Sequence, residues 1–132
     1  MSQENVDLAR QGIDAYDRRD WVALRALNHP DVELDFSASV GPEADVYRGV
    51  DAVMRFYEKY FDAFEEIAIN AQRFIDAGAS VVIPTRSRSV GRGGVEVFAR
   101  GTFVLTFEDG QIVRMCLYQE TAEALKAVGL EE

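Results

Sequence analysis

The sequence predicts an α+β fold in which N-terminal helices pack against one curved antiparallel sheet. Helical apolar patterns fill the first half of the chain, whereas strands and turn residues alternate through the second half. A strongly curved sheet wrapped around the helical layer forms a cone, which buries one face of each strand and leaves a pocket inside. At 132 residues the chain suits a single domain, residues 1–132.

Two helices are expected at the N-terminus. Apolar side chains recur every three or four residues between residues 3 and 17, so they share one helix face. These side chains are Val6, Ala9, Ile13 and Tyr16. Asp20 suits the N-cap of a short second helix that begins at Trp21, and Pro30 ends that helix.

The next segment, HPDVELDFS, alternates apolar and acidic residues and predicts a strand over residues 32–36. One face carries Val32, Leu34 and Phe36, and the other carries Asp31, Glu33 and Asp35. The favoured interpretation buries the apolar face and leaves Asp35 solvated or paired outside. A one-residue bulge would instead turn Asp35 inward, where it could act as a base. The single histidine, His29, is interpreted as a cap or surface group.

A loop over residues 38–49, a helix over about 50–64 and a run of strands complete the chain. The apolar stripe of the helix consists of Val53, Tyr57, Tyr60, Phe61 and Phe64. Strands are expected at residues 67–75, 80–90, 95–107 and 111–119. Asp109-Gly110 is a strong hairpin signal, and Thr121 can cap a last helix that stops at Gly129.

The composition argues against several kinds of partner. The net charge of −9 disfavours nucleic acid and anionic membranes, which both need basic patches. The one cysteine, Cys116, cannot form an intramolecular disulfide, and the N-terminus has no signal-peptide pattern, so a cytoplasmic protein is expected. No cluster of His, Cys, Asp and Glu has ligand spacing on one face, so neither a metal nor another cofactor is expected.

Three stretches carry a resemblance to a known superfamily. They are AYDRRDWVALRALNHPDVEL, YRGVDAVMRFYEKYF and FEDGQIVRMCLYQETAEALKAVGL. In order and spacing they resemble the SnoaL-like branch of the nuclear transport factor 2-like superfamily, over nearly the whole chain. The resemblance implies a cone-shaped α+β barrel that is commonly dimeric through the outer face of its sheet. Its members include ketosteroid isomerases, polyketide cyclases, epoxide hydrolases and dehydratases, so the fold alone does not name a reaction.

The resemblance also allows each chemistry to be tested against the residues. In an ungapped match, the oxyanion-hole tyrosine, the base and the oxyanion-hole acid of ketosteroid isomerase would fall on Gly12, Phe36 and Phe103. Only the tyrosine that supports the oxyanion hole matches, at Tyr57. True ketosteroid isomerase activity is therefore not expected. Scytalone dehydratase uses two histidines and the epoxide hydrolase needs an Arg-x-Asp pair on a strand, and neither feature is present. A SnoaL-type cyclase needs an inward carboxylate, for which Asp35 is again the candidate.

Strand parity, matched to the same family, predicts the lining of the pocket. The residues turned inward are Ile83, Thr85, Ser87, Ser89, Ala99, Gly101, Phe103, Leu105, Val113, Met115, Leu117 and Gln119. The candidate substrate-binding residues are Tyr16, Phe36, Tyr60, Thr85, Ser87, Phe103, Met115 and Gln119. They form an apolar cavity with neutral polar groups, which suits a small apolar molecule. The alternative is that these side chains simply fill the core.

Three arginines would then lie on the outer face of the sheet: Arg86, Arg88 and Arg100. Ion pairs with Glu96, Glu33 or a partner subunit are the favoured interpretation, and an anion site is the alternative. If the assignment of inward and outward residues is shifted by one position along the strands, these arginines line the pocket instead. Phe98 and Val104 also point outward and would expose an apolar patch, so a homodimer is predicted.

Two functions remain open from the sequence. The first is a cofactor-independent acid/base enzyme of isomerase, cyclase or hydrolase type, with Asp35 as base and Tyr57 as hydrogen-bond donor. The second is a non-catalytic module of the same fold for ligand binding or dimerisation. An ionisable group facing the cavity would distinguish them, because an interior without one leaves only tyrosines to move a proton.

Overall fold

A computed structural model describes residues 2–38 and 45–130. These residues form four helices and seven strands, and none of the helices is long and apolar enough to cross a membrane. In chain order the elements are α1 (Ser2–Asp17), α2 (Trp21–Leu27), β1 (Asn28–Asp35), β2 (Val46–Arg48), α3 (Val50–Asp62), β3 (Phe64–Ala71), β4 (Ile75–Ala77), β5 (Ser80–Gly91), β6 (Glu96–Glu108), β7 (Gln111–Tyr118) and α4 (Thr121–Ala127).

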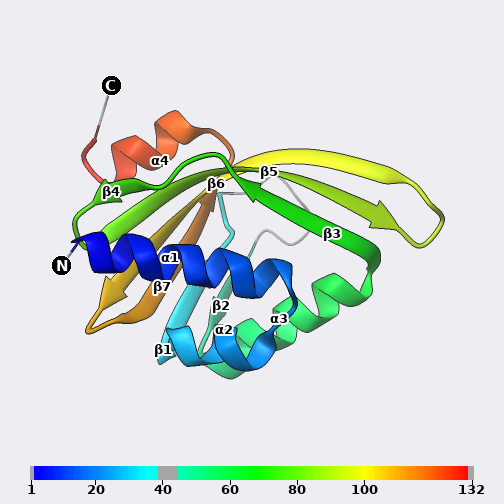
Figure 1. Ribbon diagram of the computed structural model, residues 1–132, viewed down its shortest axis with the longest axis horizontal. Coiled ribbons are helices and arrows are strands. Elements are labelled where there is room, and N and C mark those ends of the chain that lie inside the picture. Colours follow the sequence, from blue (N-terminus) through cyan, green and yellow to red (C-terminus); the bar gives the residue numbers. More distant parts are fainter. Residues whose placement is uncertain (1, 39–44, 131–132) are drawn as a thin grey trace.

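The strands form one curved, unclosed sheet in the order β2-β1-β7-β6-β5-β3, with β4 paired to β5. The helices α1 and α3 lie on one side of the sheet and α4 lies on the other (Figure 1). The predicted α+β class and cone-like arrangement are therefore confirmed. One pairing differs from the expected antiparallel pattern, because β1 runs parallel to β7, with an irregular register between Asn28 and Glu33.

The main core lies between the inner face of the sheet and the helices. Val32 and Leu34 of β1 are fully buried there, which confirms the apolar face of the HPDVELDFS stretch. On β7 the register shifts at the bulge beside Thr106, so Ile112 enters the core rather than Val113. The expected inward position of Val113 was wrong, because a bulge inserts one residue and reverses the parity beyond it.

Several element boundaries differ from the sequence-based expectation. The expected loop at residues 38–49 contains a short strand, β2, and its residues 39–44 lie outside the described residues. The expected strand 67–75 is divided into β3 and β4 by Gln72, whose backbone N–H donates to the carbonyl of Pro84. Glu120, and not Thr121, is the N-cap of α4, since it forms a reciprocal capping box with Glu123.

A second, smaller core lies on the outer face of the sheet beneath α4. Val82, Val104 and Cys116 pack there against Ala124 and Leu125. Val104, expected as part of an exposed patch, is thus covered by the chain's own last helix and is 5% exposed.

The far end of the β5–β6 hairpin has no such cover. It projects beyond the helices (Figure 1), and Val95, Val97 and Phe98 are exposed there. Phe98 is 72% exposed.

Candidate functional site

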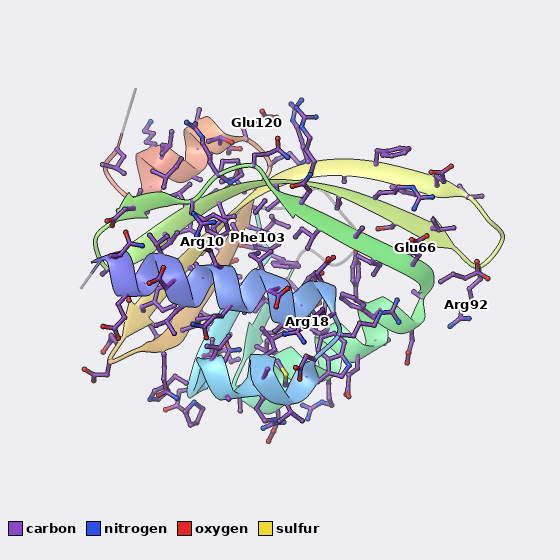
Figure 2. The ribbon with its side chains drawn as sticks, viewed as in Figure 1. Arg10, Arg18, Glu66, Arg92, Phe103 and Glu120 are labelled. Atoms are coloured by element: carbon purple, nitrogen blue, oxygen red, sulfur yellow. The ribbon has the colours of Figure 1, made fainter. Side chains whose placement is uncertain are left out.

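A cavity of about 270 Å³ lies inside the cone, between α1 and α3 and the strands β3, β5, β6 and β7. Its aromatic side chains come from α1, α3, β6 and the residue that follows β1. The strands β3 and β7 add aliphatic side chains, and β5 and β6 add small or polar ones. The lining residues are Tyr16, Phe36, Phe56, Tyr60, Ile67, Ile69, Thr85, Ser87, Ser89, Ala99, Arg100, Gly101, Phe103, Leu117 and Gln119. Figure 2 shows Phe103 on the helix side of the sheet, whereas Glu120 lies on the side of α4.

The strands keep this space open because the side chains on the inner face of β5 are small. Thr85, Ser87 and Ser89 share the inner face of β5, because successive strand residues alternate between faces. Gly101 on β6 has a specific role, since a Cβ there would lie 2.9 Å from Leu117 Cδ1. A larger residue at this position would therefore push Leu117 out of place and change the shape of the cavity.

A much smaller apolar cavity of about 30 Å³ lies deeper in the cone. It shares Tyr16, Ile69 and Phe103 with the larger cavity and is closed by Tyr57 and Met115. The Tyr57 hydroxyl donates to Met115 Sδ over 3.3 Å, so it is directed at a weak acceptor inside the core.

The two tyrosines keep their protons in this environment. Burial raises the pKa of Tyr57. Burial is also the main cause that raises the pKa of Tyr16, with smaller contributions from the charges of Tyr57, Tyr60 and Asp17. Near neutral pH both hydroxyls can therefore donate a hydrogen bond, but neither is suited to accept a proton as a base.

The structure places the predicted site residues in three groups. Those that line the larger cavity are Tyr16, Phe36, Tyr60, Thr85, Ser87, Phe103 and Gln119. Tyr57 and Met115 line the small deep cavity instead. Asp35 lines neither of them.

The sequence analysis missed Phe56, Ile67 and Ile69, and it placed Arg100, which also borders the cavity, on the outer face. A signal for each of the three missed residues was present in the sequence. Phe56 lies four residues before Tyr60 on α3, so both fall on one helix face. Ile67 and Ile69 alternate along β3.

Asp35 lies on the outer face of β1, within an ion-pair network. Its carboxylate accepts from the Arg114 guanidinium over 2.9 Å and from the Ser37 backbone N–H over 2.9 Å. Glu33 joins the network through Arg114 at 3.2 Å and Arg48 at 3.3 Å. The hydrogen bond from the Ser37 side chain is the largest cause that lowers the pKa of Asp35, and Arg114 adds to it. The Asp35 carboxylate thus links β1 to Arg114 of β7 and lines neither cavity.

Asp35→Asn is expected to cost at most about 1 kcal/mol of unfolding free energy. The folded-state pKa lies below the unfolded value near 3.8, so the carboxylate stabilises the fold above that value. This contribution is lost as the pH falls through the folded-state pKa. Urea unfolding of both proteins at pH 7 and below pH 4 measures it, and the difference between them should shrink at the lower pH. A difference that stays the same or grows at the lower pH would contradict an ionised, paired Asp35 carboxylate.

The chemical groups at the cavity are mostly neutral. Among the described residues that line it, none is Asp, Glu, His or Lys, and the one charged residue is Arg100. The Arg100 guanidinium pairs with Glu120 at 2.6 Å, on the side of α4. His29 lies elsewhere, and its Nδ1 accepts from the backbone N–H of Asp31 over 3.0 Å. In the described parts of the chain no group of three or more His, Cys, Asp or Glu side chains could hold a metal ion.

The three positions matched to the catalytic groups of ketosteroid isomerase lie near one another, but they hold residues without acid or base groups. The rings of Phe36 and Phe103 lie 6.3 Å apart at the cavity, and Gly12 borders the small cavity beneath them. A Cβ at Gly12 would meet Leu27 Cδ1 only at 3.9 Å, so there is space for a side chain that the sequence does not supply. The arrangement can surround an apolar ring, but it offers no acid or base at these positions.

Comparison with known proteins agrees with this fold. The family described as SnoaL-like domain matches residues 9–115, and the chain belongs to this family. No curated protein matches the chain.

Solved structures share the fold at low sequence identity. An NTF2-like protein of unknown function from Burkholderia pseudomallei is 23% identical with a TM-score of 0.78, over 96% of this chain and 98% of that one. TerC, co-crystallised with polyporic acid, is 17% identical with a TM-score of 0.78, over 95% and 98%. Rv0760c from Mycobacterium tuberculosis, in complex with estradiol-17β-hemisuccinate, is 19% identical with a TM-score of 0.76, over 89% and 94%.

Proposed function

We propose that the chain binds a small, largely apolar ring molecule inside the cone. The observation that carries this proposal is the cavity of about 270 Å³ with an aromatic wall on one side and small hydroxyl side chains on the other. Ligand sites of this kind are mainly apolar, with a few polar groups that fix orientation. The volume suits a molecule of one or two rings, with part of a larger one remaining in the open mouth.

The cavity walls indicate how such a ligand would be oriented. Phe36 meets Phe56 edge-to-face at 5.3 Å, and Phe56 stacks on Tyr60 at 5.9 Å, so rigid rings already form one wall. Ser87 and Gln119 lie in the other walls and can hydrogen-bond a hydroxyl or carbonyl of the ligand. Two proteins of the same fold were crystallised with ring compounds, polyporic acid and an estradiol ester, which supports a ligand of this class here.

Titration with 2-naphthol tests the proposal, with naphthalene-2-sulfonate as the matched charged compound. We expect saturable binding of 2-naphthol, with amide NMR shifts concentrated at β5, β6 and α3. Within the cone cavity, followed by the amide shifts of α3, the sulfonate should bind at least tenfold more weakly than 2-naphthol, because the described lining has no unpaired cation to receive it. Shifts spread over the outer surface, or equal affinity for both compounds, would contradict binding in this cavity.

A catalytic role has one supporting observation, the Tyr16 hydroxyl. Tyr16 lines both cavities and keeps its proton, so it could donate a hydrogen bond to a developing charge on a bound oxygen. The earlier assignment of Asp35 as base and Tyr57 as donor has less support, because Asp35 pairs with Arg114 outside and Tyr57 is directed at Met115. Binding without acid/base chemistry is therefore the function that we favour.

Purified protein is expected to convert a β,γ-unsaturated ketosteroid no faster than buffer does. The positions that would carry the chemistry hold Gly12, Phe36 and Phe103, which provide neither a base nor an oxyanion donor. Ultraviolet absorbance of the conjugated product measures the rate. A rate that falls when Tyr16 is changed to Phe would show a tyrosine-based isomerase and overturn the alignment.

We also propose a cytoplasmic homodimer. The support for a dimer is the exposed apolar tip of the β5–β6 hairpin, with Val95, Val97 and Phe98 on a sheet edge that the described helices leave uncovered. Val104 does not contribute to this exposed patch, because α4 covers it.

Light scattering at micromolar concentration is expected to give about twice the mass of one chain. Phe98→Asp should shift the protein towards the monomer, since a charge would have to be buried at the contact. Glu108→Asp on the same strand, away from the tip, serves as the control. A monomeric wild-type protein would refute the dimer.

A further inference from the structure

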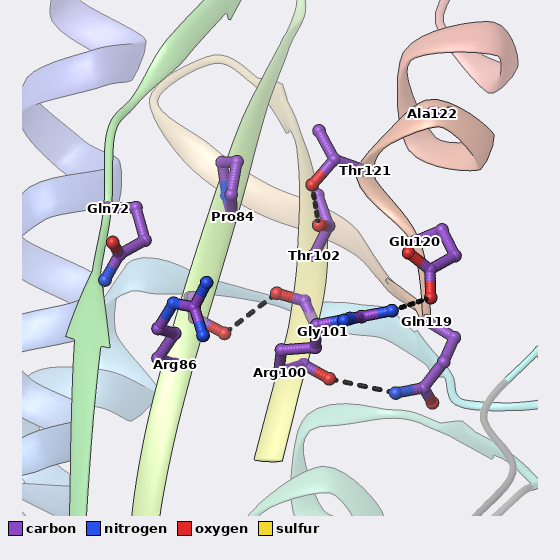
Figure 3. A pocket seen from close by; sticks show the side chains of 11 residues that line it. Gln72, Pro84, Arg86, Arg100, Gly101, Thr102, Gln119, Glu120, Thr121 and Ala122 are labelled. Carbon is purple, nitrogen blue, oxygen red and sulfur yellow. Dashed lines mark hydrogen bonds and ion pairs between the residues drawn. The ribbon is translucent and has the colours of Figure 1, made fainter.

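A second hollow lies on the opposite side of the sheet from the helices α1 and α3, and we call it the outer groove. It has a volume of about 330 Å³ and runs between β5, β6 and the start of α4 (Figure 3). The residues that line it are Gln72, Pro84, Thr85, Arg86, Arg100, Gly101, Thr102, Gln119, Glu120, Thr121 and Ala122. Unlike the cone cavity, this groove is polar and carries charged side chains.

Two arginines occupy directly paired positions on the neighbouring strands that form the outer groove. Arg86 of β5 and Arg100 of β6 are direct Cα partners in the antiparallel ladder. Side chains at such positions have Cβ atoms about 4.5–5.5 Å apart, and like charges directly opposite destabilise a sheet. Figure 3 shows the two guanidinium groups on the groove side of their strands, with Arg100 directed at Glu120.

The neighbouring outer-face arginines have carboxylate partners. Arg88 pairs with Glu96 at 2.8 Å, as expected, and also with Glu66 at 3.1 Å. Arg114 pairs with Glu33 and Asp35. Arg86, by contrast, has no carboxylate within 4.0 Å among the described residues and makes no side-chain hydrogen bond with them. Its other cross-strand neighbour, on β3, is the neutral Asn70.

The outer groove therefore holds two guanidinium groups and one carboxylate, Glu120, in a protein whose net charge is −9. An anion between Arg86 and Arg100 would remove the like-charge repulsion and supply the partner that Arg86 lacks. The planar guanidinium fork matches the oxygens of a carboxylate or a phosphate group, which can accept two parallel hydrogen bonds from it. Gln72 and Thr121 lie at the groove and add neutral hydrogen-bonding groups.

We propose that the outer groove is a binding site for a small oxyanion, a carboxylate or a phosphate, held between Arg86 and Arg100. This site is separate from the proposed ring-binding cavity, because Arg86, Thr102 and Glu120 line only the groove. Four residues border both spaces: Thr85, Arg100, Gly101 and Gln119. The Arg100 guanidinium is directed at Glu120, on the side of α4, so a bound anion would lie across the sheet from a ligand in the cone.

Titration of the full chain with sodium phosphate, at constant ionic strength maintained with sodium chloride, tests the proposal. We expect saturable NMR shifts of the Arg86 and Arg100 Nε–H signals and of the amides of residues 119–122. Arg86→Gln should weaken phosphate binding at least tenfold. Arg88→Gln is the matched control, because it removes the same charge from the same face of the same strand, and it should change the affinity less than twofold. A parallel titration with acetate distinguishes carboxylate from phosphate as the preferred group.

Three outcomes would overturn the proposal. If Arg86→Gln and Arg88→Gln weaken phosphate binding equally, phosphate is attracted by the general charge of the face. If the NMR shifts do not saturate, they reflect ionic screening. Unchanged phosphate affinity in Arg86→Gln, together with a changed monomer–dimer equilibrium, would make the groove a subunit contact.

Urea unfolding shows whether Arg86→Gln is folded, and we expect no loss of stability, since the residue is exposed and is paired with a like charge. Binding of 2-naphthol should not change in this variant.

Discussion

Ala99→Trp is expected to abolish 2-naphthol binding, with an affinity at least a hundredfold lower than that of the wild-type protein. Ala99 lies on the inner face of β6, directly opposite Ser87 of β5, and both residues line the cone cavity. An indole at this position would occupy the space that the ligand needs, since the cavity measures only about 270 Å³. The fold should persist, because Ala99 is exposed at the cavity mouth and is not part of the core.

Val97→Trp is the matched control for this blocking variant. Val97 lies two residues away on the same face of β6, but it is 49% exposed and does not line the cavity. The control should therefore bind 2-naphthol within about twofold of the wild-type affinity. Fluorescence titration of both variants measures the difference. If Ala99→Trp binds like the wild-type protein, the ligand lies elsewhere.

Phe61→Ala is expected to lower the free energy of unfolding by about 3–5 kcal/mol. Phe61 on α3 is 1% exposed and holds the aromatic cluster beside the cavity together. Its ring centroid lies 4.9 Å from that of Tyr16 and 5.1 Å from that of Trp21, both edge-to-face. Removal of the ring leaves an apolar void that these neighbours cannot fill. Because Tyr16 also lines the cavity, the variant should bind 2-naphthol more weakly as well.

Phe98→Ala removes the same atoms from the surface and serves as the comparison. Phe98 is 72% exposed, so its loss should change the unfolding free energy of one chain by no more than about 0.5 kcal/mol. Urea unfolding at pH 7, at a concentration where both variants have the same oligomeric state, measures the two values. A cost below about 2 kcal/mol for Phe61→Ala would show that the aromatic cluster repacks around the missing ring.

Alternation of apolar and polar residues predicted the buried face correctly on one strand and wrongly on another. The alternation in VELDF was sufficient to place Val32 and Leu34 in the core and Asp35 on the outer face, because one face of a paired strand must be buried. The same reasoning failed at Val113, where a bulge reversed the parity and brought Ile112 inward. A bulge depends on how two strands meet, and neither strand shows it alone.

The sequence by itself determined the α+β class and the helix faces, because these depend on local periodicity and turn chemistry, whereas the inward residues of β5 and β6 were predicted from the family resemblance. Only the tertiary structure decided that Val104 lies beneath α4, that the Asp35 carboxylate is bound by Arg114, and that Arg86 and Arg100 occupy paired positions in the outer groove. Each of these contacts joins residues far apart in the chain, and their pairing depends on strand register and on where α4 packs. Local patterns specify which face a side chain occupies, but long-range packing selects the neighbour that it meets there.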